Sequence, residues 1–372
     1  MQEILNSIEL SITRQLSEKA NSSTISLALG EPDLPLNEDQ KNLMIKLLEE
    51  NITTYSPTDG LKILKDSLNS LYQQEFHKPE LHSVVTTGTQ QALFMGIGAA
   101  SNPGDHILCV TPHYPSYEAI FKIYGLIPHF VRRGMDGKLP VSQMLEVIQN
   151  QPIKLLLLNS PNNPTGSVDE KPELDLLYSG MEGKNITVFS DEVYFGFGPD
   201  DFYSPFHYKN TVLIRGISKT YGLTGFRLAW LVTEDSHLAN RIKKYQQNIN
   251  TCPNTLVQLF VNHLLKDDMG RMQALKSTWY AGREIVLAFC QQYGIAHFPL
   301  DGSFYACLSL KDTAFANRAY DFAMHLLQTE NILVVPGKAF GTDDSFFRIN
   351  CLVPQERLTL ALKRIAVVLG LG

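Results

Sequence analysis

The chain has 372 residues, of which 44% are hydrophobic and 19% are charged, and its formal net charge is −6. This composition is typical of a globular protein with one large and one smaller domain, and it excludes an intrinsically disordered chain. The acidic balance offers no basic surface for nucleic acid, and the sequence has neither a secretory leader nor an apolar run of membrane-spanning length.

The cysteines are five in number and scattered, without closely spaced pairs. This pattern favours free thiols in a reducing compartment over disulfides or a zinc site. We therefore expect a cytoplasmic protein that binds no nucleic acid, membrane or metal.

The N-terminal part begins with apolar side chains at helical spacing over residues 3–20, which predicts an amphipathic helix with only a packing role. A strand over 25–29 then leads into a tight turn that starts at Gly30. A helix over 38–50 and a loop of turn-forming residues that contains Tyr55 follow. From the residues alone, both the turn and the loop tyrosine have an ordinary structural explanation.

Residues 84–87 predict a strand that leads through Gly88, Thr89 and Gln90 into an apolar helix. A strand, a glycine turn and a helix N-terminus together present free backbone N–H groups and the positive end of a helix dipole to an anion. Many strand-to-helix turns share this composition, so the motif alone is a weak signal. It is neither a dinucleotide fingerprint nor a P-loop.

Two further strands are followed by segments whose side chains could bind a ligand. The strand over 106–110 is followed by an aromatic segment, 112–117, that contains Tyr114. Such rings are commonly packing residues, although a flat heteroaromatic ligand needs one on its face. The apolar run 154–158 ends in Asn-Ser-Pro-Asn-Asn-Pro-Thr-Gly, residues 159–166, which also has a structural explanation as a turn.

The strand over 185–189 ends in Ser-Asp-Glu-Val-Tyr, residues 190–194. From its position alone, Asp191 is an acid at a strand end and is most simply interpreted as a helix N-cap. We assign Glu192 a structural role.

Residues 211–214 predict a buried strand ahead of Gly-Ile-Ser-Lys-Thr-Tyr-Gly-Leu-Thr-Gly-Phe-Arg-Leu-Ala, residues 216–229. Lys219 thus follows a strand's C-terminal end, where open α/β sheets bind ligands. It is either a solvated surface lysine or a desolvated amine that forms a Schiff base. Arg227 could hold an anion beside it.

The rest of the chain predicts a strand over 228–232, a helix over 236–250 and long helices over 256–292. Strands over 303–307 and 332–335, with a helix over 314–330 between them, predict an α+β module. Arg348 lies in an apolar strand over 346–350, where a lone arginine usually occupies an exposed face.

The segment 216–229 resembles the cofactor-lysine signature of the class I/II pyridoxal-phosphate (PLP) aminotransferases of fold type I, and the string 159–166 is a hallmark of the same family. The resemblance extends over nearly the whole chain. It implies an α/β fold with a large domain, whose mostly parallel seven-stranded sheet is covered by helices, and a smaller α+β domain from the N- and C-terminal parts. The expected boundaries are 1–40 for the N-terminal segment of the small domain, 41–260 for the large PLP-binding domain and 261–372 for the small C-terminal domain.

The resemblance also implies the roles of individual residues. The catalytic residues would be Lys219, which forms the Schiff base with PLP, Asp191 at the pyridine nitrogen, and Tyr194 at the O3′ oxygen. The cofactor-binding residues would be Gly88, Thr89, Gln90, Tyr114, Asn163, Asp191, Tyr194, Ser218, Lys219 and Arg227, together with Tyr55 from the neighbouring subunit. The substrate carboxylate would be bound by Gly30, Asn163 and Arg348.

Two details refine the expected phosphate site and assembly. Gly216 stands where many family members carry a serine, and Ser218 is a candidate replacement for the lost phosphate hydrogen bond. The role of Tyr55 implies a homodimer with shared active sites.

The expected reaction exchanges an amino group between an L-amino acid and a 2-oxo acid. PLP-dependent lyases, decarboxylases and cyclases on the same fold remain the alternative, because they share the same cofactor-binding residues. Residues 247–255, where dicarboxylate-specific members carry an arginine, contain none. This absence and the aromatic segment 112–117 favour neutral or aromatic amino donors. An amino-acid-sensing regulator would need a DNA-binding domain, and only about 24 residues precede the first expected strand.

Overall fold

The large domain is built on a seven-stranded sheet with the order β2-β8-β7-β6-β5-β3-β4. The structure is a computed structural model that describes residues 2–267 and 270–371. The strands are β2 His82–Thr86, β3 His106–Thr111, β4 Ile127–Arg132, β5 Ile153–Asn159, β6 Thr187–Asp191, β7 Thr211–Gly216 and β8 Ala229–Thr233. Only β8 is antiparallel to its neighbours, β2 and β7. The C-terminal ends of the other six strands therefore meet at one edge of the sheet.

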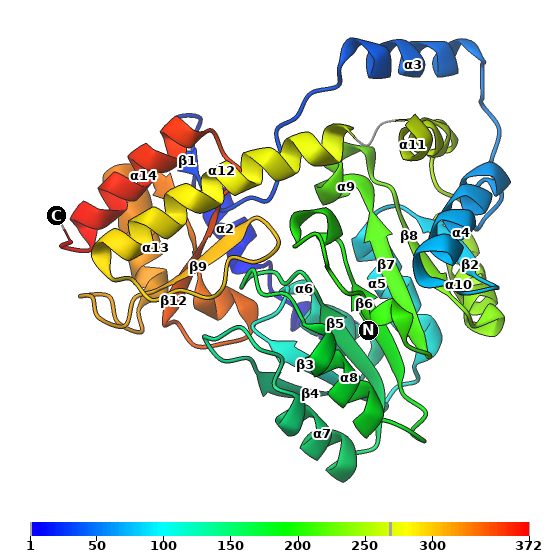
Figure 1. Cartoon of the computed structure of the whole chain (residues 1–372), viewed down its shortest axis with the longest axis horizontal. Helices are drawn as coiled ribbons and strands as arrows, with labels where there is room; N and C mark the ends of the chain where they lie inside the picture. Colours follow the sequence, from blue (N-terminus) through cyan, green and yellow to red (C-terminus); the bar gives the residue numbers. More distant parts are fainter. Residues whose placement is uncertain (1, 268–269, 372) are drawn as a thin grey trace.

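Helices cover both faces of this sheet (Figure 1). They are α4 Lys62–Phe76, α5 Thr89–Ala100, α6 Ser116–Tyr124, α7 Val141–Asn150, α8 Lys171–Gly180, α10 Ser236–Ile249 and α11 Thr255–Asp267. Along β5, Leu155 and Leu157 pack in the core beneath α5, α6 and α10, whereas Leu156 and Leu158 pack in the core beneath α7 and α8. Because successive side chains of a strand point to opposite faces, burial on both faces accounts for the unbroken apolar runs in the sequence.

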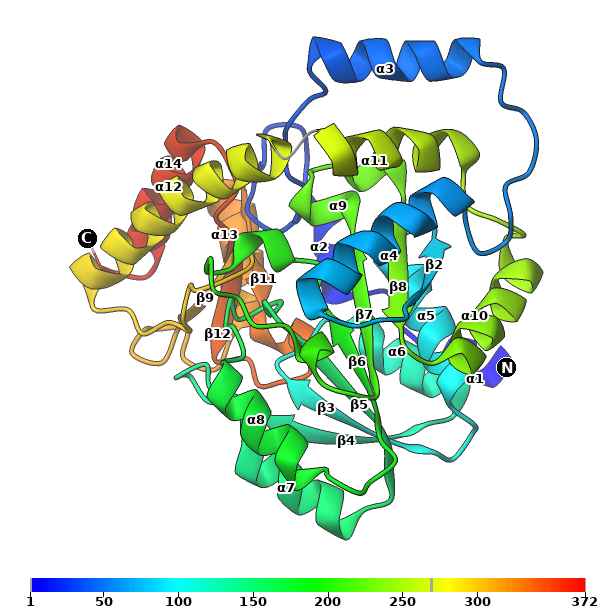
Figure 2. The same ribbon diagram turned by 45° about the vertical axis from the view of Figure 1, so that its right-hand side comes forward.

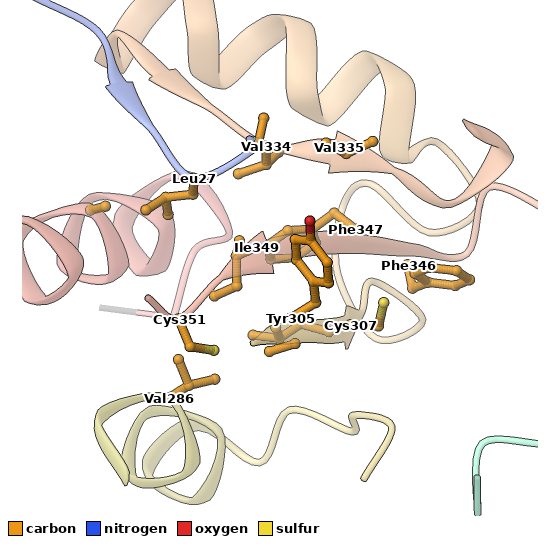
Figure 3. Packing of buried hydrophobic residues seen from close by; sticks show 14 of the residues in the cluster. Leu27, Val286, Tyr305, Cys307, Val334, Val335, Phe346, Phe347, Ile349 and Cys351 are labelled. Carbon is orange, nitrogen blue, oxygen red and sulfur yellow. The ribbon is translucent and has the colours of Figure 1, made fainter. Parts of the chain in front are cut away.

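The small domain contains a three-stranded antiparallel sheet with the order β11-β12-β9 and a short parallel pair, β1 and β10. The strands are β1 Ile25–Ser26, β9 Tyr305–Ser309, β10 Ile332–Leu333, β11 Val335–Pro336 and β12 Phe346–Asn350, and the helices are α2 Ile12–Ser17, α12 Gly270–Tyr293, α13 Ala319–Glu330 and α14 Gln355–Val368. The labelled side chains of Figure 3 belong to its core. They come from α12, from all three strands of the larger sheet, from Val334 and Cys351 beside these strands, and from Leu27 of the N-terminal segment. The N- and C-terminal parts therefore form one domain, as predicted.

The N-terminal segment differs from the prediction. The single helix expected over 3–20 is two helices, α1 Gln2–Asn6 and α2 Ile12–Ser17. Serine hydroxyls favour the break, because that of Ser7 donates to the carbonyl of Ile4 and that of Ser11 accepts from the backbone N–H of Arg14 as the N-cap of α2. The strand expected over 25–29 is limited to β1. α1 contacts α6 of the large domain, whereas Leu16 of α2 lies in the small-domain core.

The remaining elements are short or peripheral. They are α3 Glu38–Glu49, α9 Ile217–Thr220, and the 3₁₀ helices η1 Phe195–Phe197, η2 Pro205–His207, η3 Thr224–Phe226 and η4 Gly337–Phe340. Figures 1 and 2 show α3 standing apart from the body, joined to it by extended segments at both ends, and it contacts α11. Among residues 2–267 and 270–371, no helix is long and apolar enough to cross a lipid bilayer.

Candidate active site

A cavity of about 520 Å³ lies where the C-terminal ends of the parallel strands face the small domain. Most of the residues singled out in the sequence line it: Gly30, Thr89, Gln90, Tyr114, Asn163, Asp191, Tyr194, Ser218, Lys219, Arg227 and Arg348. These residues come from segments that span more than 300 positions, and the fold brings them to one place.

Lys219 lies in α9, directly after β7, and its Nζ donates a hydrogen bond to the carbonyl oxygen of Gly30. Burial lowers the pKa of this amine, and the positive charges of Arg348 and Arg227 act in the same direction, against the opposing effects of Tyr305 and Glu31. A lowered pKa increases the fraction of neutral amine, which is the form that attacks a carbonyl. The desolvated interpretation of Lys219 therefore agrees with its position.

Asp191 is the last residue of β6, and 3% of its surface is exposed. The hydroxyl of Tyr117 donates to its Oδ2 at 2.6 Å, and the backbone N–H of Val193 donates to Oδ1 with an N···O distance of 3.3 Å. Burial raises the pKa of Asp191 to about 6, although these hydrogen bonds oppose the shift. Within the described part of the chain the carboxylate has no ion pair, so a cation in the cavity would stabilise its charged form.

Glu192, the next residue, is also buried but is fully paired. It accepts hydrogen bonds from Nε of Arg215 at 3.0 Å, from Ser190 at 2.8 Å and from Ser204 at 2.5 Å. Arg215 also contacts Glu75 at 2.9 Å. The arrangement agrees with the structural role predicted for Glu192.

The N-terminus of α5 faces Arg227 across Gly88. Gly88 has a φ of +89°, and a Cβ added there would overlap Nη2 of Arg227 and lie 3.1 Å from its Cζ. Nη1 of Arg227 donates to the carbonyl of Thr224 at 2.9 Å and to Oγ of Ser218 at 3.4 Å. The site therefore combines the free N–H groups of a helix N-terminus with a hydroxyl and a guanidinium around a glycine. This combination suits a phosphate group.

Arg348 links the small domain to the sheet. Its Nη1 donates to Oδ1 of Asn163 at 2.8 Å, and its Nη2 donates to the carbonyl of Ala28 at 2.5 Å. The Nδ2 of Asn163 in turn donates to the hydroxyl of Tyr194 at 3.3 Å. Only 4% of Arg348 is exposed, which rules out the alternative of an exposed strand face. Its buried Nε has no hydrogen-bond partner within the described residues, so one donor of the guanidinium is unsatisfied.

Tyr305 is a cavity residue that sequence reasoning missed. The guanidinium of Arg348 lies 3.9 Å from the centre of its ring, and the phenol of Tyr305 helps to raise the pKa of Tyr194, after the larger effect of burial. A Cβ added to Gly30 would lie 2.8 Å from Cζ of Tyr305, so the glycine allows the ring to approach. Nothing in the strand pattern distinguished this tyrosine from the core aromatics beside it.

Other cavity residues were also missed or misjudged. Tyr117 belonged to the aromatic segment but was given no role, although it donates to Asp191. The N-terminal segment was expected only to pack, but Ser11, Thr13 and Arg14 line the cavity. Leu16 is buried, as the helical periodicity predicts, whereas Leu5 is 53% exposed. The periodicity could not show that polar residues of this segment border a cavity.

Tyr55 does not line this cavity and is 84% exposed. Its predicted contact concerns a neighbouring subunit, so it stays a prediction. The described residues contain no cluster of three or more His, Cys, Asp or Glu side chains that could hold a metal ion. All five cysteines are free.

Comparisons with known proteins agree with this geometry. The family model of aminotransferase class I and II matches residues 22–365. An aspartate aminotransferase of Pyrococcus abyssi is 29% identical, over 93% of this chain and 91% of the relative. An aromatic-amino-acid aminotransferase of Thermococcus litoralis is 27% identical, over 93% of this chain and 91% of the relative. The crystal structure of a protein named Pyrococcus protein-A1 superposes with a TM-score of 0.93 and 28% identity, and the match covers 99% of this chain and 98% of the other.

Proposed function

Because this chain belongs to the aminotransferases of class I and II, a PLP-dependent family, we propose that it transfers the amino group of an L-amino acid to a 2-oxo acid in the cavity around Lys219. Lys219 carries the proposal, since its desolvated amine lies among an anion site, a buried carboxylate and a buried arginine. Each of these groups would bind one part of PLP or of an amino acid.

The residues present fit PLP. Gly88, Thr89, Gln90, Ser218 and Arg227 would hold the phosphate, at the N-terminus of α5. The unpaired carboxylate of Asp191 would hold the pyridine nitrogen, Tyr114 would contact the face of the ring, and Asn163 and Tyr194 would donate to the O3′ oxygen. The observation that supports this assignment most strongly is the buried Asp191, since a protonated pyridine is the cation that it lacks.

When bound, PLP supplies an electron sink that stabilises negative charge at the substrate Cα. Lys219, whose amine has a lowered pKa, would act as the base that removes the proton from the substrate Cα. Burial raises the pKa of Tyr194, so its hydroxyl stays protonated and remains a donor. The free donor of Arg348 binds the substrate carboxylate and, with Asn163, orients the Cα–H bond.

The overall reaction balances without an added oxidant. The donor leaves as a 2-oxo acid after losing its amino group and its Cα proton, and the acceptor is reduced at its carbonyl carbon and takes up the same nitrogen. We propose donors with neutral or aromatic side chains, since residues 247–255 contain no arginine and Tyr114 borders the cavity. The two relatives differ on this point, because one is named for aspartate and the other for aromatic amino acids.

We also propose a cytoplasmic homodimer. The exposure of Tyr55, outside the cavity of its own chain, suits a side chain that reaches a neighbouring subunit. The free cysteines suit a reducing compartment. The domain boundaries at residues 40 and 260 are part of this proposal, and limited proteolysis of the purified protein would test them.

The test is a visible absorbance titration of the purified protein with PLP, to which L-amino acids are added one at a time. We expect one donor class to bleach the band of the PLP bound to Lys219 and a 2-oxo acid to restore it. Lys219→Ala should lack the lysine-bound band and lose activity by at least about 10³-fold. Lys244→Ala, at an exposed position of α10, is the matched control and should behave like the wild type.

The same titration separates the lyase, decarboxylase and cyclase alternative. Release of ammonia, pyruvate or CO₂, with the band restored without any 2-oxo acid, would contradict transamination. A wild-type band that survives in Lys219→Ala would contradict the cofactor assignment itself.

A further inference from the structure

A second cavity, of about 620 Å³, shares no lining residue with the cavity around Lys219. The large domain forms one side of it through residues 168–172, which include the start of α8, and through residues 201–203. The small domain forms the other side through Trp279 and Arg283 of α12 and through Asp301, which lies between α12 and β9. The proposed function leaves this cavity without a role.

Aromatic side chains give the second cavity flat apolar surfaces. Trp279 borders it and is buried, and Phe202 and Tyr203 are half-buried. The Nζ of Lys171 lies 5.2 Å from the centre of the Tyr203 ring, so the chain itself places an ammonium group against an aromatic ring of this wall. The face of an aromatic ring carries a negative potential that attracts cations. These surfaces suit a ligand with a flat apolar body and a positive charge.

The charged groups of the second cavity are mainly acidic. Its lining contains four carboxylates and two cationic side chains, namely Asp169, Glu170, Asp201 and Asp301 against Lys171 and Arg283. The two cationic groups are already paired, since Nζ of Lys171 contacts Asp175 at 2.7 Å and Nη1 of Arg283 contacts Glu284 at 2.7 Å. An anionic ligand would have to displace these contacts, whereas a cationic ligand would not.

Two of the carboxylates have acceptor capacity left. Asp201 is exposed and forms no ion pair within residues 2–267 and 270–371. Asp169 is 1% exposed, and its Oδ1 accepts from Nη2 of Arg133 at 2.5 Å, but its buried Oδ2 has no hydrogen-bond partner within the same residues. Arg133 balances the charge of Asp169, so Oδ2 lacks a donor and not a counter-charge. Because a buried acceptor without a donor is costly, an N–H group of a ligand would stabilise this side of the cavity.

We propose that the second cavity binds a small organic amine in its protonated form. Oδ2 of Asp169 accepts a hydrogen bond from the ammonium group, the charge of Asp201 attracts it, and the apolar body of the amine packs against Phe202 and Trp279. A metal ion suits the cavity less, because the part of the chain that the structure describes has no cluster of three or more His, Cys, Asp or Glu side chains that could hold one. The inference goes beyond the proposed function and does not depend on it.

The experiment titrates the purified protein with PLP and follows tryptophan fluorescence, with calorimetry as a second measure of binding. The chain has two tryptophans, of which Trp279 borders the second cavity and Trp230 is buried in the large-domain core. The probe is N,N-dimethyl-2-phenylethylamine, a tertiary amine that is charged at neutral pH and cannot form a Schiff base with PLP. We expect saturable binding, with a fluorescence change that is absent in Trp279→Phe.

Two related compounds separate the charge from the hydrogen bond. The neutral 2-phenylethanol should bind at least about tenfold more weakly, because it lacks the positive charge. The quaternary trimethyl analogue keeps the charge but has no N–H group, and it should bind roughly threefold more weakly than the tertiary amine, in line with the loss of one hydrogen bond.

Variants locate the bound amine. Asp201→Asn should weaken its binding roughly threefold, as expected for an exposed charge pair. Asp312→Asn, at an exposed position outside the cavity, is the matched control and should not change the affinity. Lys219→Ala should bind the amine as tightly as the wild type, because the two cavities have separate linings.

Each remaining outcome would overturn the inference. A loss of binding in Lys219→Ala would place the amine in the active-site cavity, and a fluorescence change that persists in Trp279→Phe would report on Trp230. Equal affinities for the amine and 2-phenylethanol, equal affinities of Asp201→Asn and Asp312→Asn, or no binding up to about 10 mM would exclude a cation site. A quaternary analogue that binds as tightly as the tertiary amine would remove the hydrogen bond to Asp169. The proposed function is tested separately, since none of these measurements uses turnover.

Discussion

The two walls of the cavity are built in different ways. On the large-domain wall, Asp191 is the last residue of β6, and Lys219 and the turn at Gly88 come shortly after β7 and β2 of the same sheet, so the hydrogen-bonded strands hold their relative positions. On the small-domain wall, Arg348 lies on β12 and Arg14 lies on α2. These two elements are not neighbouring strands of one sheet, so the packing of other segments sets their relative position. We call the large-domain side the rigid wall, because one sheet holds its groups, and the small-domain side the assembled wall, because separate elements supply its groups. We infer that the rigid wall carries the cofactor chemistry and that the assembled wall recognises the substrate.

The largest expected effect tests the rigid wall. Asp191→Asn should lower kcat on the order of 10²–10³-fold, because a neutral amide no longer stabilises the protonated pyridine nitrogen. Glu192→Gln is the matched control, an equally buried neighbour that contacts Arg215 and not the cavity. We expect Glu192→Gln to bind PLP and to turn over, and to lose up to about 3–5 kcal/mol in urea unfolding. Comparable kcat values in the two variants would contradict the division of roles.

The same carboxylate gives a pH-dependent stability in the protein without cofactor. The folded pKa of Asp191, about 6, lies above its ordinary value of 3.8, so the folded chain binds this proton more tightly than the unfolded chain. The resulting stabilisation is present below pH 3.8 and is lost as the pH rises through about 6. Asn at this position does not titrate. Between pH 4 and pH 7, the wild type should therefore lose on the order of 3 kcal/mol more than Asp191→Asn in urea unfolding, and parallel curves would refute the burial argument.

A smaller effect is expected at the phosphate end. Gly88→Ala should weaken PLP binding about tenfold, because its Cβ would displace the guanidinium of Arg227. Gly104→Ala controls for backbone strain, since Gly104 has a φ of +90° and no atom within 4 Å of an added Cβ. Both variants should lose some stability, but only Gly88→Ala should lose PLP affinity in a fluorescence titration. Equal affinities would show that Arg227 is free to move.

The smallest effect tests the assembled wall. Tyr305→Phe removes a hydroxyl that helps to raise the pKa of Tyr194 but keeps the ring beside Arg348. We expect kcat/KM to fall several-fold for every donor, because the cavity loses one polar group beside Tyr194. Tyr280→Phe, at a partly exposed position of α12, is the control. A loss of kcat/KM confined to one class of donor would mean that Tyr305 contacts the side chain of the substrate.

Much of the large-domain wall was predictable because its signals are local. An apolar run followed by a polar motif places a functional group at a strand end, and β2, β5, β6 and β7 all follow this rule. These local signals therefore place the carboxylate of Asp191 and the amine of Lys219 at one edge of one sheet. Their roles in the reaction stay predictions.

The amino-acid sequence by itself determined the alternation of strands and helices, the motifs at the strand ends and the resemblance to one enzyme family. Only the tertiary structure decided that Tyr305 lies against Arg348, that Tyr117 donates to Asp191, and that Arg14 borders the cavity. The physical reason is the range of the interactions. Strand and turn propensities act between neighbouring residues, whereas these contacts join residues far apart in the chain and exist only when both domains are folded.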